Sequence, residues 1–190
     1  MSTRAGPSIV AAFEPFGGRT RNRSWEAVRR LELTPGVERV LLPVDFVRLR
    51  KVIPKLAARI PSALLLVGEV PSGPLRVEGV ALNVLHSDRP DNAGSVVADV
   101  PIVPGAPLAL RVRWNPGEVT RALTAEGIPA VPSFHAGTYA CNAALYLALH
   151  HLPASSRVGF LHLPRRGGPP GTGLPRLVRA VELVFAVLTS

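Results

Sequence analysis

Cys141 is the single cysteine of this sequence and the residue best suited to covalent chemistry. It lies where an expected strand gives way, through a turn of small residues, to an expected apolar helix. A thiol in the first turn of a helix is close to unpaired N–H groups and to the positive end of the helix dipole, and both favour the nucleophilic thiolate. The same N–H groups can hold an oxyanion. Position alone leaves a second interpretation open, in which Cys141 is a small apolar residue packed in a core helix.

A nucleophilic cysteine needs a base, and two histidines compete for that role. His162 follows the apolar run Val158–Leu161. Because sites in α/β sheets form at the carboxyl ends of strands, His162 can lie beside Cys141. His135 is close to Cys141 in sequence, but no carboxylate near it could orient its ring. We therefore assign the acid–base role to His162 and expect a supporting or structural role for His135.

A third group should orient the imidazole, and Glu78 is the candidate. It interrupts the mostly apolar segment Leu75–Leu85, where an unpaired buried carboxylate costs free energy. A partner such as His162 would offset that cost. The alternative interpretation is that Glu78 points to solvent from an edge strand.

Two aromatic rings and one amide in the first loop predict a small binding pocket. Phe13 and Phe16 flank a proline at the end of the first expected strand, and Asn22 follows them. These groups suit a small, flat, neutral ligand with one hydrogen-bond donor and one acceptor. The alternative is that both phenylalanines are core residues beside a turn.

The elements that position these residues alternate between strand and helix, which is typical of a parallel sheet covered by helices. The expected strands are Ser8–Phe13, Val37–Pro43, Ala63–Val67, Ile128–Ser133 and Val158–Leu163. The expected helices are Trp25–Leu33 capped by Ser24, one from Asp45 to about Ile60, one from Asn115 to Gly127, Tyr139–His151 and Leu174–Leu188.

The middle of the chain departs from this alternation. Leu75–Leu85 and Leu108–Trp114 are further strand candidates, which we expect to form an antiparallel excursion or an edge of the same sheet. Near the end, the Gly- and Pro-rich segment Arg165–Gly173 predicts a mobile loop. The sequence therefore predicts an α/β fold with a mostly parallel central sheet flanked by helices, as a single domain over residues 1–190.

Composition narrows the class of protein. With 190 residues and 47% hydrophobic residues, the chain is large enough for a core and is not disordered. One cysteine excludes an intrachain disulfide and a cysteine-cluster metal site, and it fits a reducing compartment. We find no signal peptide and no apolar run long enough to span a bilayer, so we expect a soluble, cytoplasmic protein.

The net charge of +9 raises the alternative of a nucleic-acid-binding module. The arginines are scattered along the sequence, and no basic stripe alternates with aromatic residues as base-stacking modules require. Nucleic acid is therefore the less favoured partner.

Four short segments match, in order, the motifs of one enzyme family. They are FEPFGG with Asn22, Ser24 and WEAV; Glu78 with Val80-Ala81-x-Asn83; Ala136–Asn142 (AGTYACN), the most specific; and Gly159–Pro164 (GFLHLP). Pro90-Asp91-Asn92-x-Gly94 is a fifth, shorter match. In these segments the chain resembles the pyrrolidone-carboxylate peptidases, the pyroglutamyl peptidase I family of cysteine peptidases.

The resemblance implies a catalytic triad of Cys141, His162 and Glu78 that removes an N-terminal pyroglutamyl residue from peptides, with no cofactor and no metal ion. It also implies a twisted central sheet and, often, a homotetramer. The apolar C-terminal helix, with a narrow polar stripe of Arg176 and Arg179 beside Glu182, favours a homo-oligomer as well.

Some positions depart from the family's pattern. Gly79 stands where a basic residue is usual, and Gly68–Glu78 is one residue short, with Pro71–Pro74 in place of a Gly-Gly-Arg stretch. Asp88 occupies the register of an arginine thought to support the site, and Arg89 lies one position later. The triad is kept while its surroundings change. The alternative hypothesis is therefore a catalytically weakened member that acts as a binding or scaffold protein.

Overall fold

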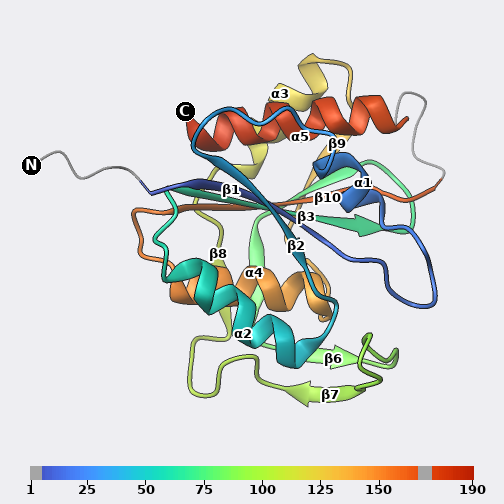
Figure 1. The fold of residues 1–190 in the computed structure, drawn as a ribbon, viewed down its shortest axis with the longest axis vertical. Helices are drawn as coiled ribbons and strands as arrows, with labels where there is room; N and C mark the ends of the chain where they lie inside the picture. The colour runs from blue at the N-terminus through green and yellow to red at the C-terminus, as the bar shows by residue number, and fades with distance from the viewer. Residues whose placement is uncertain (1–5, 167–172) are drawn as a thin grey trace, which may run out of the picture.

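The computed structural model describes residues 6–166 and 173–190 and is built around a six-stranded sheet (Figure 1). The strand order is β2-β1-β3-β10-β4-β9. The strands are β1 (Ser8–Phe13), β2 (Val37–Leu42), β3 (Ala63–Val70), β4 (Leu75–Glu78), β9 (Ala130–Ser133) and β10 (Arg157–Pro164). β2, β1, β3 and β10 are mutually parallel, whereas β4 runs antiparallel to β10 and parallel to β9. The predicted mostly parallel sheet is confirmed.

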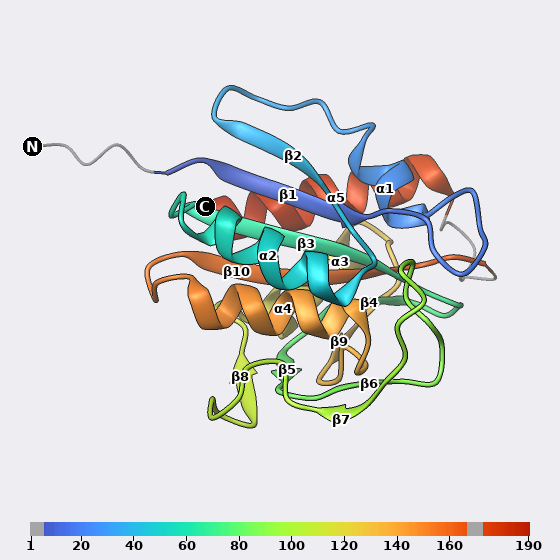
Figure 2. The ribbon, with the colours of Figure 1, turned by 60° about the horizontal axis from the view of Figure 1, so that its bottom comes forward.

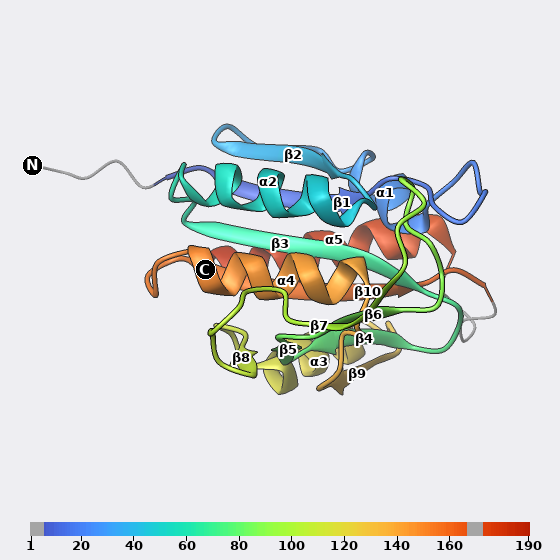
Figure 3. The same ribbon diagram turned by 90° about the horizontal axis from the view of Figure 1, so that it is seen from below.

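Helices cover both faces of the sheet, as Figures 1 and 3 show. α2 (Phe46–Ala57) and α4 (Ala140–His151) pack together on one face. On the other face lie α1 (Arg23–Val28), α3 (Pro116–Ala125) and α5 (Leu174–Thr189). The buried side chains accordingly form two clusters, one on each face of the sheet. This is the layered α/β arrangement that the strand–helix alternation predicts.

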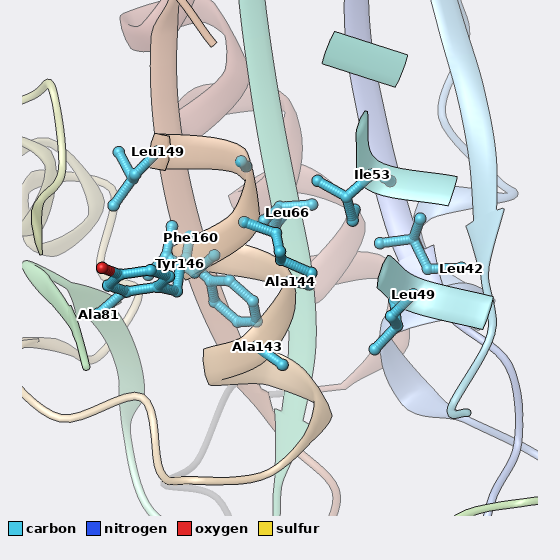
Figure 4. Close-up of a cluster of buried hydrophobic side chains, with 14 of the residues drawn as sticks. Leu42, Leu49, Ile53, Leu66, Ala81, Ala143, Ala144, Tyr146, Leu149 and Phe160 are labelled. Carbon is cyan, nitrogen blue, oxygen red and sulfur yellow. The ribbon is translucent and has the colours of Figure 1, made fainter. Parts of the chain in front are cut away.

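The core beneath α4 fixes the position of that helix (Figure 4). Ala143, Ala144 and Tyr146 of α4 are buried at 3% exposure or less, and they belong to the same core cluster as Leu66 of β3 and Phe160 of β10. Small alanine side chains let a helix lie close to a sheet, and each large apolar residue buried there contributes about 1.5–3 kcal/mol. The start of α4, which carries Cys141, is therefore held rigidly against the sheet.

Side-chain caps start three of the helices. Asp45 and Asn115 cap α2 and α3, as predicted, by accepting hydrogen bonds from backbone N–H groups in the first turn. The prediction that Ser24 caps α1 is wrong: Asn22 is the N-cap, and its Oδ1 accepts from Ser24 N at 3.0 Å. α1 also ends at Val28 instead of Leu33, because the following N–H groups bond to carbonyls three residues back and tighten into turns.

The predicted strand Leu75–Leu85 is three strands in the structure. The chain leaves the main sheet at Gly79 and continues as β5 (Val80–Leu82) and β6 (Leu85–Ser87). β5 pairs antiparallel with β8 (Ala109–Arg111), and β6 with β7 (Val97–Val100). The β5–β8 pair packs against α4 (Figure 2). The antiparallel excursion is confirmed, but β4 lies inside the main sheet and β9 forms its edge.

One further prediction concerns the segment before α5. Most of the loop Arg165–Gly173, predicted to be mobile, lies outside the described residues.

In residues 6–166 and 173–190, no helix has both the length and the apolar character that crossing a membrane requires.

Candidate active site

Strand alternation brings the predicted base and its orienting acid to one face of the sheet. Along β10, Phe160 and His162 face α4, whereas Leu161 and Leu163 belong to the core on the opposite face. Glu78 on β4 lies opposite Phe160 in the antiparallel pairing. It is therefore a diagonal neighbour of His162 on the same face. His162 Nδ1 lies 2.8 Å from Glu78 Oε1, which is a hydrogen bond between buried side chains.

Gly68 on β3 is the point at which the thiol meets the imidazole. It pairs with His162 in the parallel β3–β10 register. A Cβ on Gly68 would lie 2.9 Å from each of three atoms: Cys141 Sγ, His162 Cδ2 and Phe160 Cζ. The thiol and the ring carbon are therefore separated by no more than twice that distance. The structure brings the three predicted catalytic residues together, and the missing side chain at Gly68 makes room for them.

Glu78 is a carboxylate held in its charged form. Burial alone raises the pKa of this group, but the hydrogen bond and the charge of His162 outweigh it, with smaller contributions from Ser133 and Arg76. The pKa of Glu78 is thus below its ordinary value. A charged carboxylate accepts a hydrogen bond from Nδ1–H of His162, so Nε2 is the ring nitrogen left to face the thiol.

Cys141 is a neutral thiol in the resting site. Burial raises the pKa of the thiol well above its ordinary value, and the negative charges of Glu78 and Glu69 raise it further. Cys141 lies in the first turn of α4, directly after Ala140, as predicted. The raised pKa contradicts the prediction that this position favours the thiolate. The nucleophile therefore has to lose its proton to a base when it attacks.

A narrow cavity opens beside Cys141, and all three predicted binding residues line it. Its lining includes Phe13, Phe16, Asn22, Tyr139 and Cys141. The rings of Phe16 and Tyr139 are tilted against each other with centroids 6.0 Å apart. Mostly apolar walls and little volume suit one small, flat, uncharged group.

The amide of Asn22 is already largely used by the fold. Its Oδ1 accepts from Ser24 N and from Ser24 Oγ, and its Nδ2 donates to Glu14 O at 3.0 Å. One N–H of the amide is left for a ligand. Asn22 can therefore donate to a bound group, whereas the acceptor predicted at this position has to come from elsewhere.

The segment around Pro90 braces the walls of the cavity. Asn92 Nδ2 donates to Glu14 Oε1 at 2.8 Å and to Pro15 O at 2.9 Å, and these bonds hold the loop after β1. Tyr139 Oη donates to Pro90 O at 3.0 Å. Burial raises the pKa of Tyr139 to about 12, so its hydroxyl remains a neutral donor. The fifth matching segment thus shapes the pocket.

Asn142 is a positioning residue that the sequence analysis missed. It is fully buried, and its Oδ1 accepts from Leu82 N at 2.8 Å. Its Nδ2 donates to Leu82 O and to Val84 O. These bonds tie the first turn of α4 to the segment that follows Glu78. The available signal was an amide inside an otherwise apolar helix, because such a group must find partners when buried.

Glu69 is a second missed residue. Its side chain is only 3% exposed, lines the Cys141 cavity and forms an ion pair with Arg19. Its other oxygen accepts from Arg23 N at 2.7 Å. The signal was a carboxylate at the end of a continuous apolar strand, where strand ends gather at the site.

Two further candidate residues lie outside the cavity. His135 is exposed, and its Nδ1 accepts a hydrogen bond from Gly137 N at 3.2 Å, within its own turn. Within the described residues His135 forms no ion pair, and it does not line the Cys141 cavity. Arg89 is exposed and lines a neighbouring groove that it shares with Phe16 and Tyr139.

The site contains a thiol beside an imidazole, and the imidazole is hydrogen-bonded to a carboxylate. That set can perform nucleophilic acyl transfer with general acid–base catalysis. In the part of the chain that the structure describes, no three His, Cys, Asp or Glu side chains are grouped closely enough to hold a metal ion.

Comparison with known proteins shows to which family the chain is related. The family model for pyroglutamyl peptidase matches residues 8–171. The pyrrolidone-carboxylate peptidase of Thermococcus onnurineus is 40% identical, covering 93% of this chain and 96% of the relative. That of Chromobacterium violaceum is 39% identical, covering 82% and 76%.

Solved structures give the same relationship. The pyrrolidone carboxyl peptidase of Thermus thermophilus is 39% identical with a TM-score of 0.87, covering 94% of this chain and 98% of its own. A mutant of the Pyrococcus furiosus protein is 30% identical with a TM-score of 0.86, covering 95% and 97%. The resemblance and the α/β fold inferred from the sequence are confirmed, and the chain belongs to the pyroglutamyl peptidase family.

Proposed function

We propose that this chain is a cysteine peptidase that removes the N-terminal pyroglutamyl residue from peptides with a Cys141–His162–Glu78 triad. The observation that carries the proposal is that Cys141 and His162 come together at Gly68, beside a small apolar cavity, while His162 is hydrogen-bonded to Glu78. The altered residues around Gly79 and Asp88 leave these contacts between the three side chains in place. The active enzyme is therefore favoured over a silent scaffold.

The cavity suits a pyroglutamyl ring. Pyroglutamate is a neutral lactam, so it brings no ammonium that would need a carboxylate partner. Phe13, Phe16 and Tyr139 supply apolar walls, and the remaining N–H of Asn22 can donate to the lactam carbonyl. A free amino terminus would be left unsolvated in such a cavity, which gives the site its selectivity for blocked peptides.

In the acylation step, Cys141 Sγ attacks the carbonyl carbon that joins the pyroglutamyl group to the next residue. His162 Nε2 takes the thiol proton, and Glu78 stabilises the imidazolium that forms. The N–H groups in the first turn of α4 can hold the developing oxyanion. The C–N bond then breaks, and Nε2 returns the proton to the leaving amine.

Deacylation reverses the roles. A water molecule attacks the thioester carbonyl while His162 Nε2 accepts one of its protons. The C–S bond breaks, free pyroglutamate leaves, and the proton returns to Cys141 Sγ. The triad is restored, and every atom and proton comes from the substrate, the water molecule or the chain.

Release of amine from the aminomethylcoumarin amide of pyroglutamate tests this function. We expect turnover of the pyroglutamyl amide and little or none of the matched prolyl amide, which lacks the lactam carbonyl and carries a charge. No turnover of the pyroglutamyl amide at any pH from mildly acidic to mildly alkaline would contradict the proposal.

We also propose that the chain acts in the cytoplasm as a homo-oligomer, with a tetramer as the expected size. A nucleophilic thiol is best preserved in a reducing compartment. Leu183, Phe185 and Val187 of α5 are only partly buried, which supports a further protein contact on that helix. Sedimentation at low micromolar concentration is the test, and a clean monomer would contradict the assembly.

A further inference from the structure

Two open hollows flank the cavity that contains Cys141. The first, the Tyr139 groove, shares Phe16 and Tyr139 with that cavity. The second, the Glu69 hollow, shares Glu69 with it. The Tyr139 groove is much larger than the narrow cavity beside Cys141, with a volume of about 480 Å³, so it has room for amino-acid residues.

Arginines that are scattered in the sequence gather around these two hollows. Arg19 and Arg165 line both of them. The linings together contain three carboxylates, Asp88, Glu26 and Glu69, against six arginines: Arg19, Arg21, Arg23, Arg89, Arg165 and Arg166. The mouth of the site therefore carries an excess of positive charge. We call these six residues the arginine rim.

Part of the arginine rim has no neutralising carboxylate among the residues that the structure describes. Arg19 pairs with Glu69, and Arg21 lies 3.6 Å from Glu26. Among the described residues, no carboxylate lies within 4.0 Å of Arg89, Arg165 or Arg166. Unpaired cations lining a cleft attract anionic ligands and raise their local concentration.

Arg165 follows directly after the last residue of β10, three positions beyond His162, and lines both hollows. Its backbone N–H donates to Val70 O at 2.8 Å, which continues the β3–β10 pairing just beyond His162. In the described part of the chain, its Nε is buried without a hydrogen-bond partner. A buried donor left without a partner costs free energy that a bound acceptor would recover.

We propose that the arginine rim binds the leaving part of the substrate and favours peptides with Asp or Glu in the first two positions after the pyroglutamyl residue. The inference rests on the proposed function. With the pyroglutamyl ring in the small cavity, the rest of the peptide has to continue into the open hollows. A carboxylate there meets Arg89, Arg165 or Arg166. Asp88, on the Tyr139 groove, moderates the preference.

A panel of short pyroglutamyl peptides tests the inference on the unaltered protein. The members differ only at the first or second residue after pyroglutamate, which is Glu, Gln or Lys. We expect kcat/KM for Glu to exceed that for Gln by about threefold to tenfold, the range of one or two exposed ion pairs. Lys should be the poorest. The preference should shrink as salt screens the charges.

The outcomes distinguish failure of the proposed acidic preference from failure of the proposed peptidase function. Equal kcat/KM for Glu, Gln and Lys, with normal turnover of the pyroglutamyl coumarin amide, overturns the inference alone. No turnover of that amide overturns the proposed function instead. Inhibition of amide turnover by a short oligonucleotide, but not by a glutamate-rich peptide, assigns the rim to nucleic acid and overturns the inference as well.

A charge reversal with a matched control locates the effect. Arg89 holds its turn through its backbone, which bonds to Ser87 Oγ, so Arg89→Glu should keep the local fold. Arg111→Glu on β8 makes the same charge change at an exposed position that lines neither hollow. The Glu-over-Lys ratio should fall or invert in Arg89→Glu and stay unchanged in Arg111→Glu. Equal changes in both variants, or no change in Arg89→Glu, contradict the assignment.

Discussion

Replacing Gly68 with alanine tests the geometry of the site with a single methyl group. Gly68 lies in β3 and its φ angle is not positive, so alanine causes no backbone strain there. The new Cβ would lie 2.9 Å from Cys141 Sγ and from His162 Cδ2, whereas ordinary contacts begin at 3.4 Å. The sulfur, the imidazole, or both must move by about half an ångström or more, the shortfall between these distances.

The expected loss is much larger in activity than in stability. Overpacking of this kind costs about 1–3 kcal/mol of unfolding free energy. A misplacement of about 1 Å between reacting groups can cost about a hundredfold in rate. We expect Gly68→Ala to lower kcat/KM for the pyroglutamyl coumarin amide by about tenfold to a hundredfold. Urea unfolding measures the change in stability in the same preparation.

Gly159→Ala is the matched control in the neighbouring strand. Its Cβ would meet the ring of Trp114 at 2.7 Å, so the crowding is comparable but lies away from the thiol. This variant should lose similar stability and keep most of its activity per folded molecule. Full activity in Gly68→Ala, or an equal loss in both variants, would refute the placement of Cys141 and His162 around Gly68.

Other substitutions test the roles of individual groups. His162→Ala should lower kcat by about 10³-fold or more and His135→Ala only mildly; the reverse order would overturn the assignment of the base. Glu78→Gln should lower kcat less than His162→Ala does. Because folding lowers the pKa of Glu78, the charged carboxylate should stabilise the folded protein fully above pH 4.5, and this contribution should be lost as pH falls further; urea unfolding at several pH values measures it. Glu69→Gln removes a charge that raises the pKa of Cys141, so iodoacetamide should alkylate the thiol faster at neutral pH; an unchanged rate would refute that effect.

Local sequence patterns predict the buried strands and helices well, because a buried element has to be made mostly of apolar residues. β1 has the predicted bounds Ser8–Phe13, and its last five residues are buried. The middle of the chain could not be predicted in the same way. Leu75–Leu85 reads as one apolar run, but the chain leaves the main sheet at Gly79, where a side chain would meet the Phe134 ring at 2.9 Å. The close approach of Gly79 to Phe134 brings together residues that are distant in the sequence, so the local pattern of apolar residues does not reveal it.

The candidate reactive residues could be singled out from their chemistry, whereas the residues that support them could not. A thiol, an imidazole and a buried carboxylate are uncommon enough in apolar surroundings to be noticed individually. Gly68 matters for the side chain that it lacks, and its importance follows from the β3–β10 register, which is a tertiary property. Choosing Asn22 over Ser24 as the helix cap likewise needs the extended backbone of Asn22, since both residue types can cap.

The most direct test compares the unaltered protein with Cys141→Ser in the hydrolysis of the pyroglutamyl coumarin amide. The two side chains are nearly equal in size, so urea unfolding should show similar stability. A serine hydroxyl beside His162 is a far weaker nucleophile in a site built around a thiol. We predict steady turnover by the unaltered protein and turnover near background by Cys141→Ser. Comparable turnover by both proteins would contradict nucleophilic catalysis by Cys141.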